Sequence, residues 1–274
     1  MPILTLTSDI GLRDFMVGAI KGQILLINDS LQLIDINHDL TPFNYPQAAY
    51  VCKNAIRHFP PESFHMILVN LFDVKPNHMI MAKHGDQYIG IADNGLLTMI
   101  LGGLPQEWRA LKMDASNPRN ALTCVKVFTE AYSEILAGVP FQKIGESISN
   151  INEKHSLRPL LGPNFIEGQI IFIDHFENVI VNITREDFES QRQGRHFRIV
   201  FKRNEVIERI SETYADVSEG ENLALFNAAG YLEIAVNKGN AAGLFGLEGF
   251  SDNSTQNQFQ QNRLYYQTVR VIFS

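Results

Sequence analysis

The chain has 274 residues, of which 45% are hydrophobic and 19% are charged. A chain of this length buries roughly 75% of its unfolded surface, which is enough for one or two globular domains. The 23 Lys and Arg residues are outnumbered by 30 Asp and Glu residues, so the net charge is -7, and no basic cluster stands out. This balance argues against nucleic acid and anionic membranes as partners, because both require clustered cations.

The start of the chain does not resemble a signal peptide, since residues 1–9 lack a basic group and reach an acid, Asp9, too early. No later stretch has eighteen consecutive apolar residues, so the sequence predicts no membrane span. We therefore expect a cytoplasmic protein. The two cysteines, Cys52 and Cys124, are far apart, and we expect buried thiols rather than a disulfide or a metal site.

Apolar runs alternate with helical patterns in the first half of the chain. In the helical patterns, hydrophobic residues recur every three or four positions. Strands that alternate with helices are typical of an α/β layer with a mostly parallel sheet. The predicted strands cover residues 2–7, 31–36, 64–71 and 87–92, and the predicted helices cover 16–27, 45–58, 95–101 and 128–136.

The pattern changes at residues 158–164, which are rich in Pro and Gly and predict a linker between an α/β domain, 1–157, and a second domain, 165–274. Short strand patterns separated by turn residues then indicate a small antiparallel β domain, barrel-like in form. The polar tract 252–262 predicts a solvated loop. The predicted strands of the second domain cover 168–173, 179–183, 197–201, 223–226, 231–236 and 266–273.

The sequence contains no glycine-rich phosphate loop, no nucleophile elbow and no His/Cys metal cluster. Polar residues instead follow the predicted strand ends, where ligands of α/β sheets usually bind. The Asp9 carboxylate offers two acceptor oxygens, which suit a vicinal diol such as that of ribose. The alternative is that Asp9 holds the turn and Asp14 caps the helix. The residues after the strand ends are Asp9, His38, Asn70 and Asp93.

We interpret His38 as a structural histidine and residues 92–95 as a turn that caps the following helix. Two polar clusters of the second half, residues 174–178 and 237–242, also follow predicted strands. Both are compatible with plain β turns. Their asparagines are equally compatible with adenine recognition, because an amide pairs one donor with one acceptor.

Seven segments, in order, resemble one family: the S-adenosyl-L-methionine (SAM) hydroxide adenosyltransferases, or SAM hydrolases, whose relatives include SAM-dependent fluorinases and chlorinases. The resemblance implies an α/β amino-terminal domain followed by a small β-barrel domain. It also implies a homotrimer, with the adenosyl site between the first domain of one subunit and the second domain of a neighbour. The segments are residues 7–22, 35–49, 60–69, 92–97, 137–140, 172–183 and 227–242.

The resemblance implies a small-molecule adenosyl ligand, SAM or adenosine, with no cofactor and no metal. In the first domain, Asp9 matches the aspartate that holds the ribose diol in this family. Phe43 matches an aromatic residue that lines the ribose and the C5′ region. Together with the matches in the second domain given below, these residues imply that the adenosine half of the site is intact.

In the second domain, the resemblance places Asp174 and Asn178 near the methionine amine and the adenine. Asn240 and Ala241 match contacts on the adenine edge. Ala228 departs from the family, which commonly has a serine near the methionine carboxylate at this position. An unpaired, half-buried carboxylate would cost about 1 to 3 kcal/mol, so this change is expected to weaken SAM relative to adenosine.

The family displaces methionine from C5′ with water or halide, and its hydrolases resemble one another in positioning the water with an Asp, Arg and His triad. In this sequence the aspartate position falls on Asn70, the arginine position on Asn77 and the histidine position on Thr123. All three triad side chains are replaced by groups that do not titrate. The catalytic residues are therefore unknown at this point.

Two hypotheses remain open. The chain is either a divergent SAM hydrolase that forms adenosine and methionine, or a catalytically silent adenosine or SAM binder such as a sensor or assembly subunit. In the first case Asn70, Thr123 and the altered loop position the water, and Asp73, Lys75 or His78 could replace the triad. An activity on another nucleoside is a weaker third hypothesis, and little in the sequence favours a halogenase.

Overall fold

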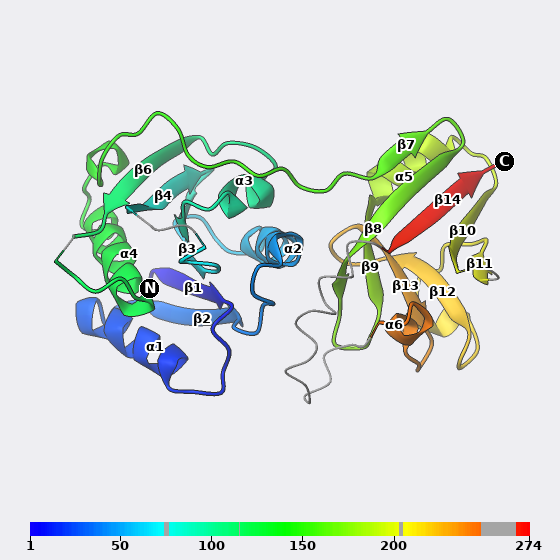
Figure 1. Ribbon diagram of the computed structural model, residues 1–274, viewed down its shortest axis with the longest axis horizontal. Coiled ribbons are helices and arrows are strands. Elements are labelled where there is room, and N and C mark those ends of the chain that lie inside the picture. The colour runs from blue at the N-terminus through cyan, green and yellow to red at the C-terminus, as the bar shows by residue number, and fades with distance from the viewer. Residues whose placement is uncertain (74–76, 115, 203–204, 248–266) are drawn as a thin grey trace. The chain divides into compact units, whose positions relative to one another are not determined.

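The computed structural model describes residues 1–73, 77–114, 116–202, 205–247 and 267–274. It divides into two compact units, Met1–Ser156 and Leu157–Ser274, each with a hydrophobic core of its own (Figure 1). The segment 158–164, predicted as a linker, contains strand β7 (Leu160–Gly162), which pairs with β8 (Phe165–Ile173). The polar tract 252–262, predicted as a solvated loop, lies outside the described residues.

The first unit is built on a mixed sheet that confirms the predicted α/β class. β1 pairs in parallel with β2 and β3, and β3 pairs in parallel with β5. β4 is antiparallel to both β5 and β6, so the sheet is mostly but not wholly parallel. The strand order is β2 (Gln32–Asn37), β1 (Ile3–Ser8), β3 (Phe64–Leu68), β5 (Gln87–Ala92), β4 (His78–His84) and β6 (Glu107–Lys112).

Helices cover both faces of this sheet. α1 (Met16–Ile27) and α4 (Ala121–Leu136) pack together on one face, and α2 (Tyr45–Ile56) and α3 (Leu96–Leu101) pack together on the other (Figure 1). Successive strand residues point to opposite faces, so each core takes alternate residues of the central strand β3. Met66 and Leu68 belong to the core under α1 and α4, and Ile67 belongs to the core under α2 and α3.

Asparagine caps fix where two of these helices begin. The Asn44 side chain accepts a hydrogen bond from the backbone N–H of Gln47 and starts α2. The Asn120 side chain accepts one from the N–H of Thr123 and starts α4 seven residues before the predicted start at residue 128. Such caps satisfy backbone donors that the first helical turn leaves unpaired.

The second unit is a nearly closed, barrel-like antiparallel sheet, as predicted. The two ends of its strand order approach each other through a bridge between Ile210 and Ala224 and a hydrogen bond from Asn222 Nδ2 to Glu205 Oε2. The order is β11 (Glu205–Ile207), β10 (Phe197–Lys202), β14 (Thr268–Phe273), β8, β9 (Val179–Thr184), β13 (Tyr231–Val236) and β12 (Asn222–Phe226). The short elements around it are α5 (Arg185–Arg192), α6 (Ala241–Leu244) and the 3-10 turn Tyr214–Asp216, while the first unit has the 3-10 turn Phe141–Lys143.

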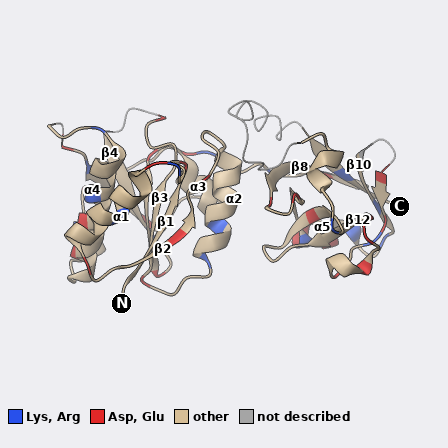
Figure 2. Ribbon diagram, turned by 90° about the horizontal axis from the view of Figure 1, so that it is seen from below, with Lys and Arg blue, Asp and Glu red and all other residues tan. Residues whose placement is uncertain are grey.

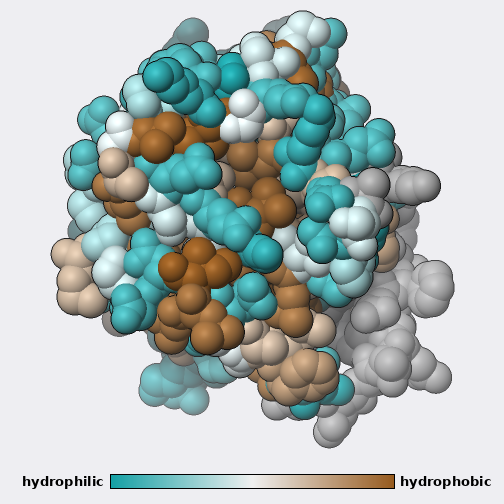
Figure 3. Space-filling view, turned by 90° about the vertical axis from the view of Figure 1, so that its left-hand side faces the viewer, coloured by the Kyte–Doolittle hydropathy of each residue, from teal (hydrophilic) through white to brown (hydrophobic). Residues whose placement is uncertain are grey.

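The surface is mixed in charge and polarity. Lys and Arg alternate with Asp and Glu along the described ribbon of both units (Figure 2). Figure 3 shows hydrophobic side chains in small patches separated by hydrophilic ones, which is ordinary for a protein surface. Within the described residues, no helix combines the length and apolar character needed to cross a membrane.

Cys52 and Cys124 are both buried and unpaired, which confirms the prediction for the cysteines. Across the part of the chain that the structure describes, no three His, Cys, Asp or Glu residues are grouped so that they could hold a metal ion. Burial raises the pKa of the Cys52 thiol to about 12 and that of Cys124 to about 11. Both thiols therefore stay protonated and serve as small core residues.

Candidate functional site

The candidate site of the first unit lies at one edge of the sheet. β1, β2, β3 and β5 are parallel, so the loops that follow their carboxyl ends share that edge. These loops carry the polar residues singled out in the sequence. They are Asp9 after β1, His38 after β2, Asn70 after β3 and Asp93 after β5.

Asn70 joins two of the predicted ligand residues. Its backbone N–H donates to Asp9 Oδ2 at 2.9 Å, and its side-chain Oδ1 accepts from the backbone N–H of Phe43 at 2.8 Å. Asn70 and Phe43 both have a positive φ, 48° and 64°, which few residues other than glycine adopt. The two hydrogen bonds therefore hold two strained loops in one fixed arrangement around Asp9.

The Asp9 carboxyl is half-buried, and burial raises its pKa above the ordinary value although the hydrogen bond from Asn70 opposes the shift. Its oxygens remain acceptors when it is ionised, so a pair of hydroxyl donors would satisfy it. The backbone of Phe43 is linked to Asp9 through Asn70, and the Phe43 side chain is 64% exposed. An ionised carboxylate with acceptor capacity to spare suits a vicinal diol.

Tyr45, the first residue of α2, and Asp73, on the loop after β3 with Asn70, form a second contact. The Tyr45 hydroxyl donates to Asp73 Oδ2 at 2.7 Å. Burial and the Asp73 carboxylate raise the pKa of Tyr45, so the hydroxyl keeps its proton. Lys154 Nζ lies over the face of the Tyr45 ring, 4.0 Å from its centre, and this cation–π contact helps to hold the ring in place.

The sequence predictions did not include Tyr45 in the site. Its only sequence signal was its place at the start of a helical pattern, beside the cap Asn44. Lys154 was also missed, because it lies 60 residues from Asn94, whose backbone carbonyl it contacts at 2.7 Å. Such a pairing across the chain can be seen only in the folded molecule.

The three positions at which the sequence analysis expected a triad are not joined to one another by any hydrogen bond of the described residues. Asn70 contacts Asp9 and Phe43, as described above. Asn77 is exposed in the loop before β4, and Thr123 is bonded to its own helix cap, Asn120, through both its N–H and its hydroxyl. None of the three supplies a titratable group.

His78 Nε2 lies 3.1 Å from Asp93 Oδ2, and the other oxygen of Asp93 accepts from the backbone N–H of Asn152 at 2.7 Å. Asp93 thus pairs with a histidine rather than capping the next helix. Asn94 Oδ1 accepts from the N–H of Leu96, the first residue of α3, at 3.1 Å. The turn predicted at residues 92–95 is present, but the N-cap position is Gly95, so no side chain caps the helix from that position.

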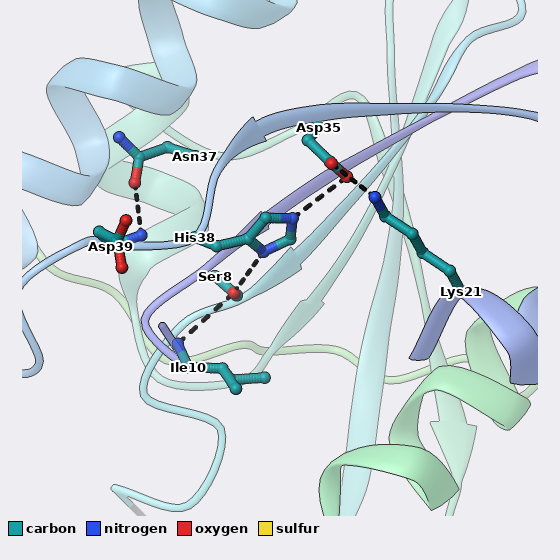
Figure 4. A network of polar contacts seen from close by, with 7 residues as sticks. All are labelled: Ser8, Ile10, Lys21, Asp35, Asn37, His38 and Asp39. Atoms are coloured by element: carbon teal, nitrogen blue, oxygen red, sulfur yellow. Dashed lines mark hydrogen bonds and ion pairs between the residues drawn. The ribbon is translucent and has the colours of Figure 1, made fainter. Parts of the chain in front are cut away.

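His38 is a structural residue, as the sequence analysis expected. It is 4% exposed; its Nδ1 lies 2.8 Å from Ser8 Oγ and its Nε2 lies 3.1 Å from Asp35 Oδ1. Asp35 in turn pairs with Lys21 Nζ at 2.6 Å (Figure 4). This chain of contacts ties the end of β1 to β2 and α1, and it fixes the backbone from which Asp9 projects.

In the second unit, Asp174 and Asn178 close the turn between β8 and β9. Asp174 Oδ1 accepts from the backbone N–H groups of Phe176 and Asn178 at 2.9 and 2.8 Å, and its Oδ2 accepts from Asn178 Nδ2 at 3.0 Å. These hydrogen bonds show that residues 174–178 form a turn, and they leave its role in ligand binding a prediction. The amide oxygen of Asn178 is its remaining side-chain acceptor.

Asn240 and Ala241 lie next to this turn. The backbone N–H of Ala242 donates to the carbonyl of Glu177 at 2.9 Å and joins the two clusters. Asn240 caps the short helix α6, with its Oδ1 accepting from the N–H of Gly243 at 2.6 Å. The structure thus brings the four predicted residues of this unit together at one end of its sheet.

A buried carboxyl that the sequence analysis missed lies near this turn. Glu233 on β13 is 3% exposed, and its Oε1 accepts from the Tyr214 hydroxyl at 2.7 Å. Burial and, to a lesser degree, the Asp174 carboxylate raise the pKa of Glu233. The available signal was a single acid inside the otherwise apolar strand 231–236.

Residues 4–145 match the family model of the SAM hydroxide adenosyltransferase N-terminal domain, and residues 168–252 match that of the C-terminal domain. The chain is 29% identical to an (R)-S-adenosyl-L-methionine hydrolase of Methanocaldococcus jannaschii, over 90% of this chain and 93% of that protein. It is 25% identical to a fluorinase of Actinopolyspora mzabensis, over 93% and 97%. An uncharacterized conserved protein from Thermotoga maritima shares the fold, with a TM-score of 0.77, 24% identity, and coverage of 99% and 100%.

Proposed function

The chain belongs to the SAM hydroxide adenosyltransferase family, and from this we propose that it binds the adenosyl group of SAM and hydrolyses SAM to adenosine and methionine. Relatives named as (R)-SAM hydrolases, which match over about nine-tenths of this chain, support the hydrolase reaction. The match to fluorinases supports the same displacement at C5′ with a different nucleophile.

One observation carries the proposal: the half-buried carboxylate of Asp9 is fixed by the N–H of Asn70, whose side chain also holds the backbone of the exposed Phe43. We assign Asp9 to the ribose diol and Phe43 to the ribose and C5′. Both hydroxyls of a diol donate to an ionised carboxylate in charge-assisted hydrogen bonds, which are about twice as strong as neutral ones.

The second unit would hold the rest of the ligand. Asp174 and Asn178 are assigned to the methionine amine and the adenine, and Asn240 and Ala241 to the adenine edge. The connection of the two clusters through Ala242 and Glu177 supports a common ligand surface there. The methionine carboxylate would lack the partner that a serine at position 228 provides.

In the proposed reaction, the oxygen of water attacks C5′ and the electron pair of the C5′–S bond moves to sulfur. Methionine leaves as a neutral thioether, so the leaving group needs no acid, and the reaction needs no cofactor. The proton of the attacking water is the only one that must be removed. The protein must therefore orient the water and C5′ and provide an acceptor for this one proton.

The proposal includes a homotrimer in the cytoplasm, with the site shared between subunits. Large apolar side chains on the loops beside Asp9 support the association, since clustered exposed hydrophobic residues mark contact surfaces. These exposed residues are Leu12, Phe15, Phe43 and Phe72.

A silent adenosine or SAM binder is the second candidate. The observation that favours it is the replacement of the triad by Asn70, Asn77 and Thr123, none of which can accept a proton from water at neutral pH. It shares the ligand residues of the first candidate. Only turnover separates the two.

A timed incubation with SAM tests the proposal. The wild-type protein and Asp9→Ala are each incubated with SAM, and adenosine is quantified by liquid chromatography against a protein-free control. We expect the wild type to release adenosine above the control and Asp9→Ala to release much less. Binding of adenosine without release would favour the silent binder, and absence of both would contradict the proposed function.

A further inference from the structure

The loop after β3 makes two contacts beside Asp9, one with the loop after β2 and one with Tyr45, the first residue of α2. Asn70 Oδ1 accepts from the N–H of Phe43 at 2.8 Å, and Asp73 Oδ2 accepts from the hydroxyl of Tyr45 at 2.7 Å. The backbone N–H of Asp73 donates to the carbonyl of Asn70 at 3.3 Å, so Asp73 is held to the same turn. The residues assigned to the ribose and C5′ and this second carboxylate thus share one small surface.

Asp73 is suited to act on water. Its side chain is exposed, one of its oxygens is held by Tyr45, and the other has no hydrogen-bond partner among the described residues. A carboxylate with one oxygen fixed and one open presents a single, oriented acceptor. Asn70, in contrast, uses its amide oxygen on the backbone and cannot take up a proton.

Tyr45 acts as the donor of this pair and Asp73 as the acceptor. Burial and the Asp73 carboxylate raise the pKa of Tyr45, with a smaller contribution from the Asp9 carboxylate, so the hydroxyl stays protonated. Lys154 over the ring and the cap of Asn44 on the first turn of α2 hold Tyr45 in place. The hydrogen bond therefore runs in one direction, with the Tyr45 hydroxyl as donor and the Asp73 carboxylate as acceptor.

From this geometry, and resting on the proposed function, we infer that Asp73 is the general base of SAM hydrolysis in this protein and that Tyr45 is its positioning residue. Asp73 accepts a proton from water as the water oxygen bonds to C5′ and the C5′–S pair moves to sulfur. The products are adenosine, methionine and a protonated Asp73, which returns its proton to solvent. Asp73 thus supplies a proton acceptor, which the side chains of Asn70, Asn77 and Thr123 cannot provide.

The test compares Asp73→Asn and Tyr45→Phe with the wild type, measuring kcat and KM for SAM hydrolysis and the Kd of adenosine by calorimetry. A general base contributes about 100- to 10,000-fold, so kcat of Asp73→Asn should fall by at least about 100-fold. Its adenosine Kd should stay within about threefold of the wild type, because the base does not hold the ribose. Tyr45→Phe should lower kcat less and leave KM unchanged.

Asp86→Asn is the matched control. Asp86 is an exposed aspartate in the β4–β5 turn, at the opposite edge of the sheet, and the change removes the same charge. Its kcat should equal that of the wild type. The double variant Tyr45→Phe, Asp73→Asn should be no slower than Asp73→Asn, since residues that act as one unit are not additive.

Unchanged kcat in Asp73→Asn would overturn the inference while leaving the proposed hydrolysis in place. A loss of kcat in His78→Gln together with full activity in Asp73→Asn would also overturn it, in favour of the His78 and Asp93 pair. A loss of kcat in Asp73→Asn that is matched by loss of adenosine binding would assign Asp73 a structural role instead. If the wild type binds adenosine but releases none from SAM, both the proposed hydrolysis and the role of Asp73 as its general base would be contradicted.

Discussion

The proposed function assigns the ribose to Asp9, and two opposing effects set the protonation state of its carboxyl. Burial raises the pKa of its carboxyl, while the N–H of Asn70 donates to the ionised form and lowers it; burial dominates. Only the ionised form accepts both hydroxyls of a diol. The affinity for adenosine should therefore follow the ionisation of this one group.

This gives a prediction with a definite sign. Adenosine affinity should be constant at high pH and should weaken, by up to tenfold per pH unit, as the pH falls through the raised pKa of Asp9. The loss should begin at a higher pH than for an ordinary aspartate. Calorimetric titration at a series of pH values measures it. Asp9→Asn should bind adenosine weakly and without this pH dependence; an equal dependence in that variant would assign it to another group.

Glu233 gives a second prediction, on stability. Burial raises its pKa above the ordinary value of 4.5, so the folded protein holds this proton more tightly than the unfolded chain. The resulting stabilisation is full below pH about 4.5 and is lost as the pH rises through the folded pKa. Glu233→Gln keeps an acceptor for Tyr214 but cannot ionise. Relative to the wild type, it should gain stability as the pH rises from 4.5 to 7.

Urea denaturation of both proteins at these pH values measures this difference. The comparison cancels the contributions of the other titrating groups, which the two proteins share. A constant difference between the wild type and Glu233→Gln across the pH range would show that Glu233 ionises equally in the folded and unfolded states.

At the scale of elements, the sequence predicted the parallel core of the first sheet but not its antiparallel strands. The predicted strand at residues 64–71 ends at Leu68, because Asn94 Nδ2 binds the carbonyls of Val69 and Asn70 and turns the chain there. This turn depends on a contact across 24 residues. β4 (His78–His84) was missed because its short apolar run has few β-branched residues, which are the usual strand signal.

Part of the candidate site was predictable because it depends on strand ends, which a sequence pattern can locate. Asp9 follows a strand that the periodicity located, whereas Asn70 fell inside the predicted strand 64–71 and follows the shorter β3, which ends at Leu68. Parallel strands bring such positions to one edge. The contact from Tyr45 to Asp73 was not predictable, because it depends on the two loops adopting positive φ at Phe43 and Asn70. Strained loop backbones leave little trace in a sequence pattern.

The start of α5 allows a prediction at this scale. Thr184 and Asp187 form a capping box: the Thr184 hydroxyl accepts from the N–H of Asp187, and the Asp187 carboxylate accepts from the N–H of Thr184, each at 3.1 Å. Thr184→Ala should lower the free energy of unfolding by about 1 kcal/mol, as measured in urea. Ser190→Ala, on the exposed side of the same helix, should change it by less than about 0.5 kcal/mol. Equal losses in the two variants would contradict the cap.

For the whole molecule, the resemblance of seven segments assigned ligand residues to both units. The structure shows that each set is held together within its own unit: Asp9, Asn70 and Phe43 by hydrogen bonds, and residues 174–178 and 240–242 through Ala242. Composition and spacing alone could not distinguish these residues, as ligand contacts, from polar residues in other turns of the chain. The family resemblance selected them, and the hydrogen bonds explain how the chain holds them.

The proposed trimer makes a prediction at the same scale. Light scattering after size exclusion should give three times the mass of the chain, because the exposed apolar loops beside Asp9 need to be covered. Phe15→Ser, which changes a 74% exposed side chain on these loops, should shift the protein towards monomer. Leu26→Ser, at an 86% exposed position near the end of α1, should not. A monomeric mass for the wild type at all concentrations would contradict the trimer.

The central claim is that the Asp9 carboxylate holds the ribose diol, and a double-mutant cycle tests it most directly. Calorimetry compares adenosine with 2′,3′-dideoxyadenosine on the wild type and on Asp9→Ala. The wild type should prefer adenosine by about 2 to 4 kcal/mol, or about 30- to 900-fold, and Asp9→Ala should show almost no preference. An equal preference in both proteins would show that Asp9 does not contact the ribose.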